Sequence, residues 1–375
     1  MPSAEIITIG TEILLGEIVD TNTRYIALAL RDLGLDLFRT VTIGDNIERI
    51  AAAIRESMQR TDIIITTGGL GPTVDDPTRE AVAKAAGLET EFSEELWQQV
   101  IETISRYGRK PSENQRRQAV IPKGAIPVKN PVGTAPAFIV ETSRTAIISL
   151  PGVPNEMEHI LHESVIPYLQ KRYDLRHVIK VRVLHCAGLG EGTIDEKIGD
   201  LETLANPTVG LAAHTGVVDV RIAAKAESEG AAAALIAGIE RDVRQRLGNA
   251  VFGADDDRLE TVALDAAARR GWTLVGVESG LKGMLAERLP RTISLADADF
   301  AGLLEAARSA RADSKVDVAI GVWASEEQRA AEMVLITPRG EKTHRITYGG
   351  PHRSVRRWAV NLALNWLRTS AQESP

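Results

Sequence analysis

The chain has 375 residues, of which 44% are hydrophobic and 25% are charged, with a formal net charge of −7 and a mean hydropathy of −0.08. These values exclude a disordered, fibrous or membrane-embedded chain, and the length favours two or three domains. No run approaches the roughly 20 consecutive apolar residues of a membrane-spanning helix, and residues 1–10 lack the pattern of a signal peptide, so we expect a cytoplasmic protein that neither enters a membrane nor binds nucleic acid broadly.

The first 150 residues alternate strand and helix patterns. Short apolar runs predict buried strands over residues 5–10 and 62–67, and residues 36–44 predict another strand between them. Apolar residues at helical spacing follow each run, with a left-handed cap expected at Gly34 and an N-cap at Asp45 or Asn46. This alternation predicts an α/β fold with a doubly wound, mostly parallel sheet, which binds ligands beyond the carboxyl ends of its strands.

A glycine-rich loop follows the third strand, in the sequence TTGGLGPTVDD at residues 66–76. Gly68, Gly69 and Gly71 can adopt positive φ and bring backbone N–H groups close to a ligand. The start of the next helix adds partial positive charge, so the loop favours an anion such as a phosphate. The sequence is neither a Walker A loop nor a GxGxxG motif, and neither nucleotide motif is assigned.

Two adjacent aspartates end this loop. Asp75 and Asp76 suit an anion site if a divalent cation bridges them to a phosphate, or if one carboxylate accepts hydrogen bonds from a hydroxyl or amino group of the ligand. Asp76, directly before Pro77, is equally suited to cap the helix predicted over residues 77–87. The sequence alone leaves both roles open.

Six motifs along residues 6–157 resemble those of the CinA (competence/damage-inducible) family. In chain order they are ITIGTEILLGEIVDTNTRYIALALRDLG, VTIGDN, TTGGLGPTVDD, NQRRQAVIP, NPVGTAPAF and LPGVPNEM. The first domain of that family is similar to the molybdopterin-binding domains of molybdenum cofactor biosynthesis proteins. The resemblance implies an αβα molybdopterin-binding-like domain at 1–167, a small KH-like α+β connecting domain at 168–256, and an α/β domain similar to nicotinamide-nucleotide amidohydrolases at 257–375.

The resemblance also implies one pocket in the first domain, formed by the glycine loop and the GTE, GDN and PGVP turns. Asp76 aligns with the functional aspartate of the fold, whereas Asp75 stands where the relatives often carry a basic residue. The implied catalytic residues are Asp76, Asp75 and Glu12, and the two aspartates are also the implied metal ligands. The implied substrate-binding residues are Gly10, Thr11, Asp45, Asn46, Gly68, Gly69, Gly71, Thr73, Gly133, Thr134, Pro151 and Gly152.

Purely structural roles stay open for several of these residues. Thr11 and Glu12 suit a simple turn, Asp45 suits a helix cap, and Thr134 suits an anchor for the GTAP turn.

For CinA-type first domains the family implies hydrolysis of the pyrophosphate bond of ADP-ribose with Mg²⁺, Co²⁺ or Mn²⁺. In-line attack on a phosphoanhydride needs a cation and N–H groups on the nonbridging oxygens, and a carboxylate that ligates or orients. The alternative hypothesis is a noncatalytic scaffold that binds a pterin or a nucleotide. We also expect a homodimer.

The middle module combines two strand patterns, in HVIKVRVLHCAG and VVDVRIAAKA, with one strong helix pattern. In that helix Leu235, Ile239 and Val243 recur at four-residue steps and are expected to face the core. The GLGEG loop at 188–192 carries no Lys or Arg, which favours a connecting or dimerising role over RNA binding. Cys186, the single cysteine, excludes an intrachain disulfide and a thiolate metal cluster, and we expect it to be a buried apolar side chain.

The last domain keeps only part of the amidohydrolase motifs of the family. VGVESGLKGMLAERL retains Glu278 and Ser279 of the AESCTGG turn but not its Cys-Thr-Gly portion. A serine needs a positioned base to act as a nucleophile, and Lys282 is a candidate. We expect instead that Ser279 caps a following helix and that nicotinamide mononucleotide deamidase activity is lost. Glu278, Ser279 and Arg353 then form a degenerate second site.

The final helix pattern, PHRSVRRWAVNLALNWL, is amphipathic. Three arginines are expected on a solvated face and three apolar residues at four-residue steps on the inner face. These residues are Arg353, Arg356 and Arg357, and Trp358, Leu362 and Trp366, respectively.

Overall fold

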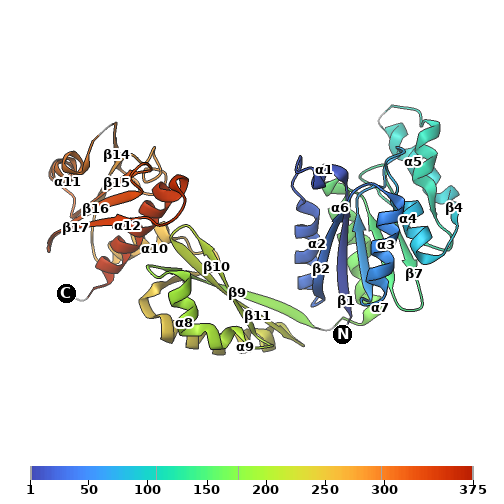
Figure 1. Cartoon of the computed structure of the whole chain (residues 1–375), viewed down its shortest axis with the longest axis horizontal. Helices are drawn as coiled ribbons and strands as arrows, with labels where there is room; N and C mark the ends of the chain where they lie inside the picture. The colour runs from blue at the N-terminus through green and yellow to red at the C-terminus, as the bar shows by residue number, and fades with distance from the viewer. Residues whose placement is uncertain (1, 107, 176, 297, 374–375) are drawn as a thin grey trace. The chain divides into compact units, whose positions relative to one another are not determined.

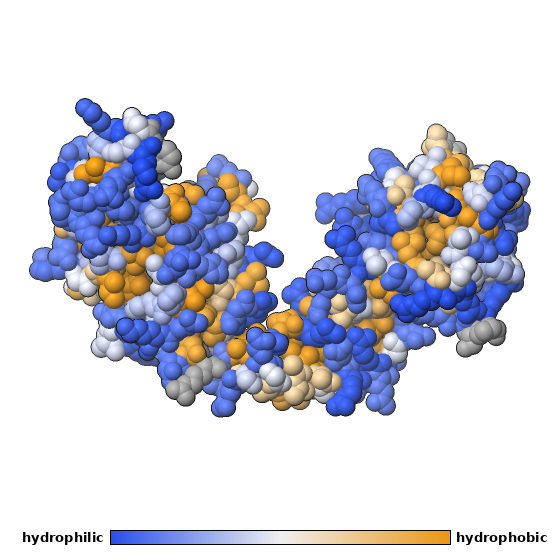
Figure 2. Space-filling model, turned by 180° about the vertical axis from the view of Figure 1, so that it is seen from behind, coloured by the Kyte–Doolittle hydropathy of each residue, from blue (hydrophilic) through white to orange (hydrophobic). Residues whose placement is uncertain are grey.

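The computed structural model describes residues 2–106, 108–175, 177–296 and 298–373. The chain divides into two compact units, Met1–Ile179 with Lys225–Ala232, and Lys180–Ala224 with Ala233–Pro375 (Figure 1). Polar and charged residues cover most of the surface visible in Figure 2. None of the helices in the described residues has the length and the hydropathy required to cross a membrane.

The first unit is built around a six-stranded sheet in the order β2-β1-β3-β8-β7-β6. β2, β1, β3 and β8 are parallel, and β7 pairs antiparallel with both β8 and β6, which confirms the predicted doubly wound, mostly parallel sheet. The strands of this sheet are β1 (Ser3–Ile9), β2 (Asp36–Ile43), β3 (Ile63–Thr67), β6 (Ile126–Val128), β7 (Ala137–Glu141) and β8 (Ala146–Leu150).

Helices cover both faces of this sheet, and a two-stranded ribbon accompanies them (Figure 1). The helices are α1 (Thr11–Leu14), α2 (Thr21–Asp32), α3 (Ile47–Met58), α4 (Thr78–Ala86), α5 (Glu94–Arg106), α6 (Pro154–Ile160) and α7 (Ile166–Tyr173), with a 3-10 segment at Glu113–Ala119 and a π-helical segment at Leu161–Val165. The ribbon pairs β4 (Thr90–Phe92) with β5 (Val120–Pro122).

Alternate residues of the central strands serve the two faces, because successive strand side chains point to opposite sides of a sheet. Ala4 and Ile6 of β1 belong to a core with α2, α6 and α7. Ile7 and Ile9 belong to a second core with α3, α4 and α5. The continuous apolar runs of β1 and β3 therefore reflect burial on both sides.

The helix ends agree only in part with the sequence predictions. Gly34 has a φ of 70°, as expected of the left-handed position after α2. Asn46 rather than Asp45 caps α3, and its side chain accepts a hydrogen bond from the N–H of Arg49. The capping role considered for Asp76 is wrong, since α4 begins at Thr78 with Pro77 at the cap position and without a side-chain cap bond.

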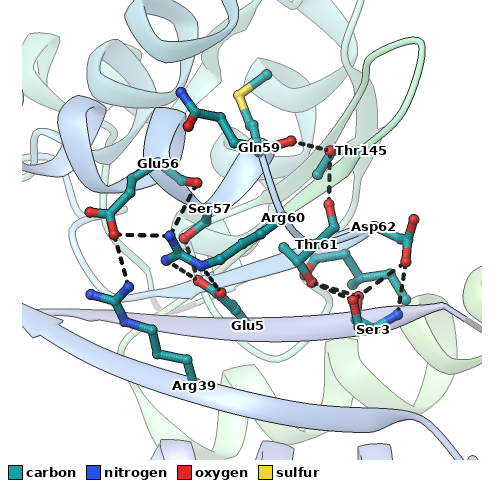
Figure 3. A network of polar contacts seen from close by, with 12 residues as sticks. Ser3, Glu5, Arg39, Glu56, Ser57, Gln59, Arg60, Thr61, Asp62 and Thr145 are labelled. Carbon is teal, nitrogen blue, oxygen red and sulfur yellow. Dashed lines mark hydrogen bonds and ion pairs between the residues drawn. The ribbon is translucent and has the colours of Figure 1, made fainter.

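A polar network stabilises the first unit toward the amino end of β1 (Figure 3). The carboxylate of Glu5, only 4% exposed, accepts hydrogen bonds from Ser57 and from the guanidinium of Arg60. Glu56 pairs with both Arg60 and Arg39 at the surface, each at 2.9 Å. This network ties β1 to the end of α3.

The middle segment forms a four-stranded sheet in the order β10-β11-β9-β12 with two helices, which confirms the small α+β module. Its elements are β9 (Val178–Ala187), α8 (Glu191–Glu202), β10 (Thr208–His214), β11 (Val217–Ala226), α9 (Glu229–Leu247), a 3-10 segment at Gly248–Ala250 and β12 (Val251–Ala254). Cys186 is fully buried, as predicted, and burial raises the pKa of its thiol to about 12. Leu235 is 40% exposed, so the predicted inner face of α9 is wrong there; Ile236 takes that place.

The C-terminal segment contains a five-stranded sheet in the order β14-β13-β15-β16-β17. β14, β13 and β15 are parallel, whereas β16 pairs antiparallel with both β15 and β17. The elements are α10 (Leu259–Arg269), β13 (Leu274–Ser279), β14 (Thr292–Leu295), α11 (Phe300–Ser314), β15 (Val318–Ser325), β16 (Ala330–Thr337), β17 (Gly340–Thr347), a 3-10 segment at His352–Ser354 and α12 (Val355–Gln372).

The inner face of α12 is rotated from the predicted one. The fully buried positions are Val355, Ala359, Ala363, Leu364 and Leu367, while Trp358, Leu362 and Trp366 pack at the margin of the core. Arg353 and Arg357 are exposed, as predicted. Arg356 is not a solvated side chain, because its Nε donates to the Gly280 carbonyl at 2.8 Å and its guanidinium pairs with Glu326 at 2.9 Å.

Candidate functional site

A cleft of about 560 Å³ opens in the first unit where β1, β3 and β8 end. Its lining includes Ile9 at the end of β1, Thr67 at the end of β3 and Pro151 directly after β8. Doubly wound sheets bind their ligands at this edge. The helices α3 and α4 contribute no lining residue from the described part of the chain, so the predicted contribution of the α4 start to an anion site is not seen.

The cleft gathers most of the residues that the sequence singled out. Those that line it are Gly10, Glu12, Asp45, Gly68, Gly69, Gly71, Asp75, Asp76, Thr134, Pro151 and Gly152.

Four residues from the predicted pocket, Thr11, Asn46, Thr73 and Gly133, do not line this cleft. Asn46 caps α3, and the side chains of Thr11 and Thr73 bind Asp45 and Asp76, respectively. A Cβ atom at Gly133 would lie 2.0 Å from Cδ of Glu156, so the missing side chain at this position makes room for a lining residue.

Two of the three glycines in the loop have a backbone conformation that favours glycine, whereas Gly71 does not have the positive φ considered for it. Gly68 and Gly69 have φ values of 105° and 65°. A Cβ atom at Gly68 would lie 2.1 Å from the carbonyl oxygen of Ile9, so the loop passes directly over the end of β1.

Three N–H groups of the loop remain available to a ligand. The N–H groups of Gly69, Leu70 and Gly71 donate to no acceptor in the described residues. Successive unpaired N–H groups in a glycine-rich turn form a concavity that binds anions.

A buried cation binds the carbonyl oxygens of this loop. The guanidinium of Arg79, 2% exposed, donates to the carbonyl oxygens of Leu70 and Gly71, the second at 3.2 Å. Burial lowers the pKa of Arg79 to about 10, so the side chain is still charged at neutral pH. Its Nε has no hydrogen-bond partner among the described residues.

Two of the lining aspartates bind threonines, Asp76 within its own turn and Asp45 across two segments that are distant in the sequence. Oδ2 of Asp76 accepts hydrogen bonds from the N–H of Thr73, at 2.8 Å, and from its hydroxyl. Oδ2 of Asp45 accepts from the N–H and the hydroxyl of Thr11 at 2.8 and 2.7 Å. Each aspartate thus has one oxygen occupied, and Oδ1 of each accepts no hydrogen bond from the described residues.

The lining is strongly acidic. It includes six carboxylates and, within the described ranges, neither lysine nor arginine. The six are Glu12, Asp20, Asp45, Asp75, Asp76 and Glu156. The described residues include no group of three or more His, Cys, Asp or Glu side chains arranged to hold a metal ion. A cation in the cleft would therefore need further ligands from the substrate or from water.

Sequence reasoning missed four lining residues that carry a carboxylate or an amide side chain. Asp20 caps α2, and Asn22 and Gln118 are buried amides. Glu156 lies in α6, where burial raises the pKa of its carboxyl group, an effect that a hydrogen bond from Asn130 partly opposes. All four lie inside the six motifs that resemble the family. The motifs therefore indicated these segments, although no local residue pattern pointed to the individual side chains.

Two residues of the predicted second site, Glu278 and Ser279, make hydrogen bonds within the fold. Ser279 ends β13, and its hydroxyl donates to the carbonyl oxygen of Ala298 at 2.6 Å. The predicted cap is wrong, because residues 280–290 form turns rather than a helix. The buried carboxylate of Glu278 accepts from the N–H of Leu285 at 2.9 Å and from the hydroxyl of Ser294 at 2.6 Å. Arg353 is exposed.

Two family models match successive parts of the chain. Residues 5–171 match the family described as "Probable molybdopterin binding domain", and residues 181–253 match "Damage-inducible protein CinA KH domain". The solved structure of the protein CinA from Thermoplasma acidophilum is 35% identical, covers 45% of this chain and 98% of that chain, and superposes with a TM-score of 0.41.

Two curated relatives match over most of their lengths. A putative competence-damage inducible protein of Caldanaerobacter subterraneus subsp. tengcongensis is 40% identical over 285 residues, which cover 76% of this chain and 68% of the relative. A CinA-like protein of Kosmotoga olearia is 37% identical over 340 residues, 88% of this chain and 81% of the relative. The chain therefore belongs to the CinA family, with a molybdopterin-binding-like domain followed by a CinA KH domain.

Proposed function

We propose that the cleft of the first unit binds the diphosphate of a nucleotide and hydrolyses it, with ADP-ribose as the substrate and Mg²⁺, Mn²⁺ or Co²⁺ as the cofactor. One observation carries the proposal: three unpartnered N–H groups and six carboxylates meet in a single cleft, without a lysine or arginine among its described lining residues. The N–H groups suit an anion, whereas the carboxylates repel one. A divalent cation would allow the anion and the carboxylates to share the cleft, since the cation is attracted both to the phosphate and to the carboxylates.

The donor set fits such a cation. Mg²⁺-like ions bind through one or two carboxylates and complete their coordination with substrate phosphate oxygens and water. Asp75 is exposed at the cleft, and Asp76 and Glu12 add carboxylate oxygens that have no partner in the described residues. When bound, the ion would neutralise charge on the phosphate oxygens and lower the pKa of a bound water.

Residues of the chain would bind the phosphate oxygens and accept a proton from the attacking water. The N–H groups of Gly69, Leu70 and Gly71 would hold nonbridging phosphate oxygens, and Arg79, which binds the carbonyl oxygens of the loop, would add positive charge nearby. Glu156, whose pKa burial raises, is suited to accept the proton of the attacking water. The water oxygen bonds to phosphorus as the bond to the bridging oxygen breaks, which yields AMP and ribose 5-phosphate.

A product assay tests the proposal. Purified protein is incubated with ADP-ribose and each metal in turn, and AMP is quantified by chromatography, with a chelator as the control. AMP that forms only with metal supports hydrolysis. Tight binding of ADP-ribose without turnover would instead favour the alternative, a noncatalytic scaffold for a pterin or nucleotide.

A further inference from the structure

The side-chain amide of Asn22 has a fixed orientation. Its Nδ2 donates to the hydroxyl of Thr67 and to the carbonyl oxygen of Gly152, both at 2.9 Å. The Thr67 hydroxyl in turn donates its single proton to the carbonyl oxygen of Pro151 at 2.9 Å, so it can only accept from Asn22. A carbonyl oxygen can only accept a hydrogen bond. If the amide were rotated by half a turn, Oδ1 would therefore face two other acceptors, the Thr67 hydroxyl and the Gly152 carbonyl oxygen. The contacts therefore determine which end of the amide is Oδ1.

This Oδ1 has no hydrogen-bond partner in the described residues, although Asn22 is only 8% exposed. Buried carbonyl groups without partners are rare and destabilising, so each one needs an explanation. Asn22 lines the cleft together with Gln118, which is 1% exposed and whose Oε1 also has no partner there. The cleft thus offers buried acceptors as well as the donors of the glycine loop.

We propose that Asn22 Oδ1 accepts a hydrogen bond from an O–H or N–H group of the bound nucleotide, and that Asn22 is a specificity-determining residue. This inference rests on the proposed function, since it assigns a role within the same substrate. A phosphate group at neutral pH has few protons to donate, so Asn22 Oδ1 is a poor partner for phosphate. It favours a part of the ligand that carries hydrogen-bond donors. In ADP-ribose those donors are the ribose hydroxyls and the adenine amino group.

Binding measurements with analogues separate the possible donors. The parent ligand is the α,β-methylene analogue of ADP-ribose, which resists hydrolysis, titrated calorimetrically in Mg²⁺. Three analogues each remove one class of donor: inosine in place of adenosine, a 2′,3′-dideoxy adenosine ribose, and α,β-methylene ADP, which lacks the terminal ribose. We expect wild type to bind one of them about tenfold more weakly than the parent, the size of one hydrogen bond.

The same titrations with the Asn22→Leu variant show whether the discrimination among analogues depends on Asn22. We expect the variant to bind the parent about tenfold more weakly and to lose the discrimination against that one analogue. Asn22→Ser gives the same comparison with a smaller change, should the leucine variant fail to fold. Gln99→Leu is the matched control: Gln99 is also a buried amide that donates to backbone carbonyls, but it does not line the cleft. It should lower the melting temperature and keep the discrimination.

The outcomes separate this inference from the proposed function. If wild type does not bind the parent ligand, the proposed function fails first. If wild type binds the parent and both Asn22 variants keep the full discrimination among analogues, the role of Asn22 is refuted while the nucleotide site stands. Discrimination that disappears only in Gln118→Leu would likewise overturn the assignment to Asn22.

Discussion

Arg79 donates a hydrogen bond to the carbonyl oxygen of Leu70, a loop residue whose own N–H group has no partner in the described residues. A buried guanidinium therefore holds the loop by its carbonyls, which leaves the N–H groups free for a ligand. The arrangement places a permanent positive charge next to an otherwise acidic cleft. The Arg79 side chain therefore both holds the shape of the glycine loop and offsets part of the negative charge of the cleft.

Replacing Arg79 with methionine should affect both properties. Arg79→Met leaves the carbonyls of Leu70 and Gly71 unpaired, so we expect the free energy of unfolding to fall by about 2 kcal/mol in urea denaturation. The affinity for ADP-ribose should fall about tenfold, because the anion loses a nearby charge. Arg117→Met is the control, since Arg117 forms only a half-exposed pair with Glu80. An Arg79→Met protein that binds ADP-ribose as wild type does would refute the role of the cation.

The turn between Thr73 and Asp76 predicts a variant that separates folding from catalysis. In Asp76→Asn the amide oxygen can still accept both hydrogen bonds from Thr73, but the negative charge is gone. We expect turnover of ADP-ribose to fall by roughly a hundredfold or more with little change in melting temperature. Asp299→Asn, at the N-cap of α11, is the matched control and should keep full turnover. A large loss of melting temperature with turnover retained would show that Asp76 is structural.

Glu5 makes the stability of the first unit depend on pH. Burial raises the pKa of Glu5, but the hydrogen bonds from Arg60 and Ser57 outweigh burial and lower the pKa below the usual 4.5. The ionised carboxylate thus stabilises the fold above about pH 4.5, and that stability disappears as pH falls through the lowered folded-state value. Glu5→Gln should reduce the free energy of unfolding at pH 7 by about 1–2 kcal/mol. This loss is smaller than for a fully buried ion pair, because Arg60 is partly exposed to solvent.

The difference between wild type and Glu5→Gln should shrink toward zero in denaturation curves taken at successively lower pH. Glu56→Gln provides the comparison, because Glu56 pairs with the same arginine from the exposed surface and should change stability little. A difference that is independent of pH down to strong acid would mean that Glu5 does not act through its charge.

The second site should be inert. Ser279 is 3% exposed and gives its proton to the carbonyl oxygen of Ala298, so no base is arranged to activate it among its described contacts. We expect no ammonia from nicotinamide mononucleotide, and a loss of about 1 kcal/mol in stability for Ser279→Ala. Ammonia released by wild type and abolished in Ser279→Ala would contradict this account.

The sequence determined the sheet and the glycine loop because both depend on local patterns. The apolar runs of β1 and β3 are short and bounded, and Gly68 and Gly69 occupy backbone conformations that disfavour other residues. Such features can be identified without knowing what packs against them. The position of the cleft followed from the topology.

Side-chain partners were harder to predict, because they depend on tertiary contacts. Asp76 could cap α4 or bind Thr73, and only the path of the loop decides between the two. The roles of Asn22 and Gln118 depend on segments far away in the chain, namely Gly152 and Thr134. On α9, apolar Leu235 and Ile236 are adjacent, so a small rotation of the helix decides which of them is buried.

A crystal structure with the methylene analogue of ADP-ribose and Mn²⁺ tests the central claim most directly, since the anomalous signal of Mn²⁺ locates the metal. We predict nonbridging phosphate oxygens within hydrogen-bonding distance of the N–H groups of Gly69, Leu70 and Gly71, and Mn²⁺ between the diphosphate and the carboxylates of Asp75 and Asp76. A nucleotide bound elsewhere, or a diphosphate that contacts neither the loop nor a metal, would contradict the account.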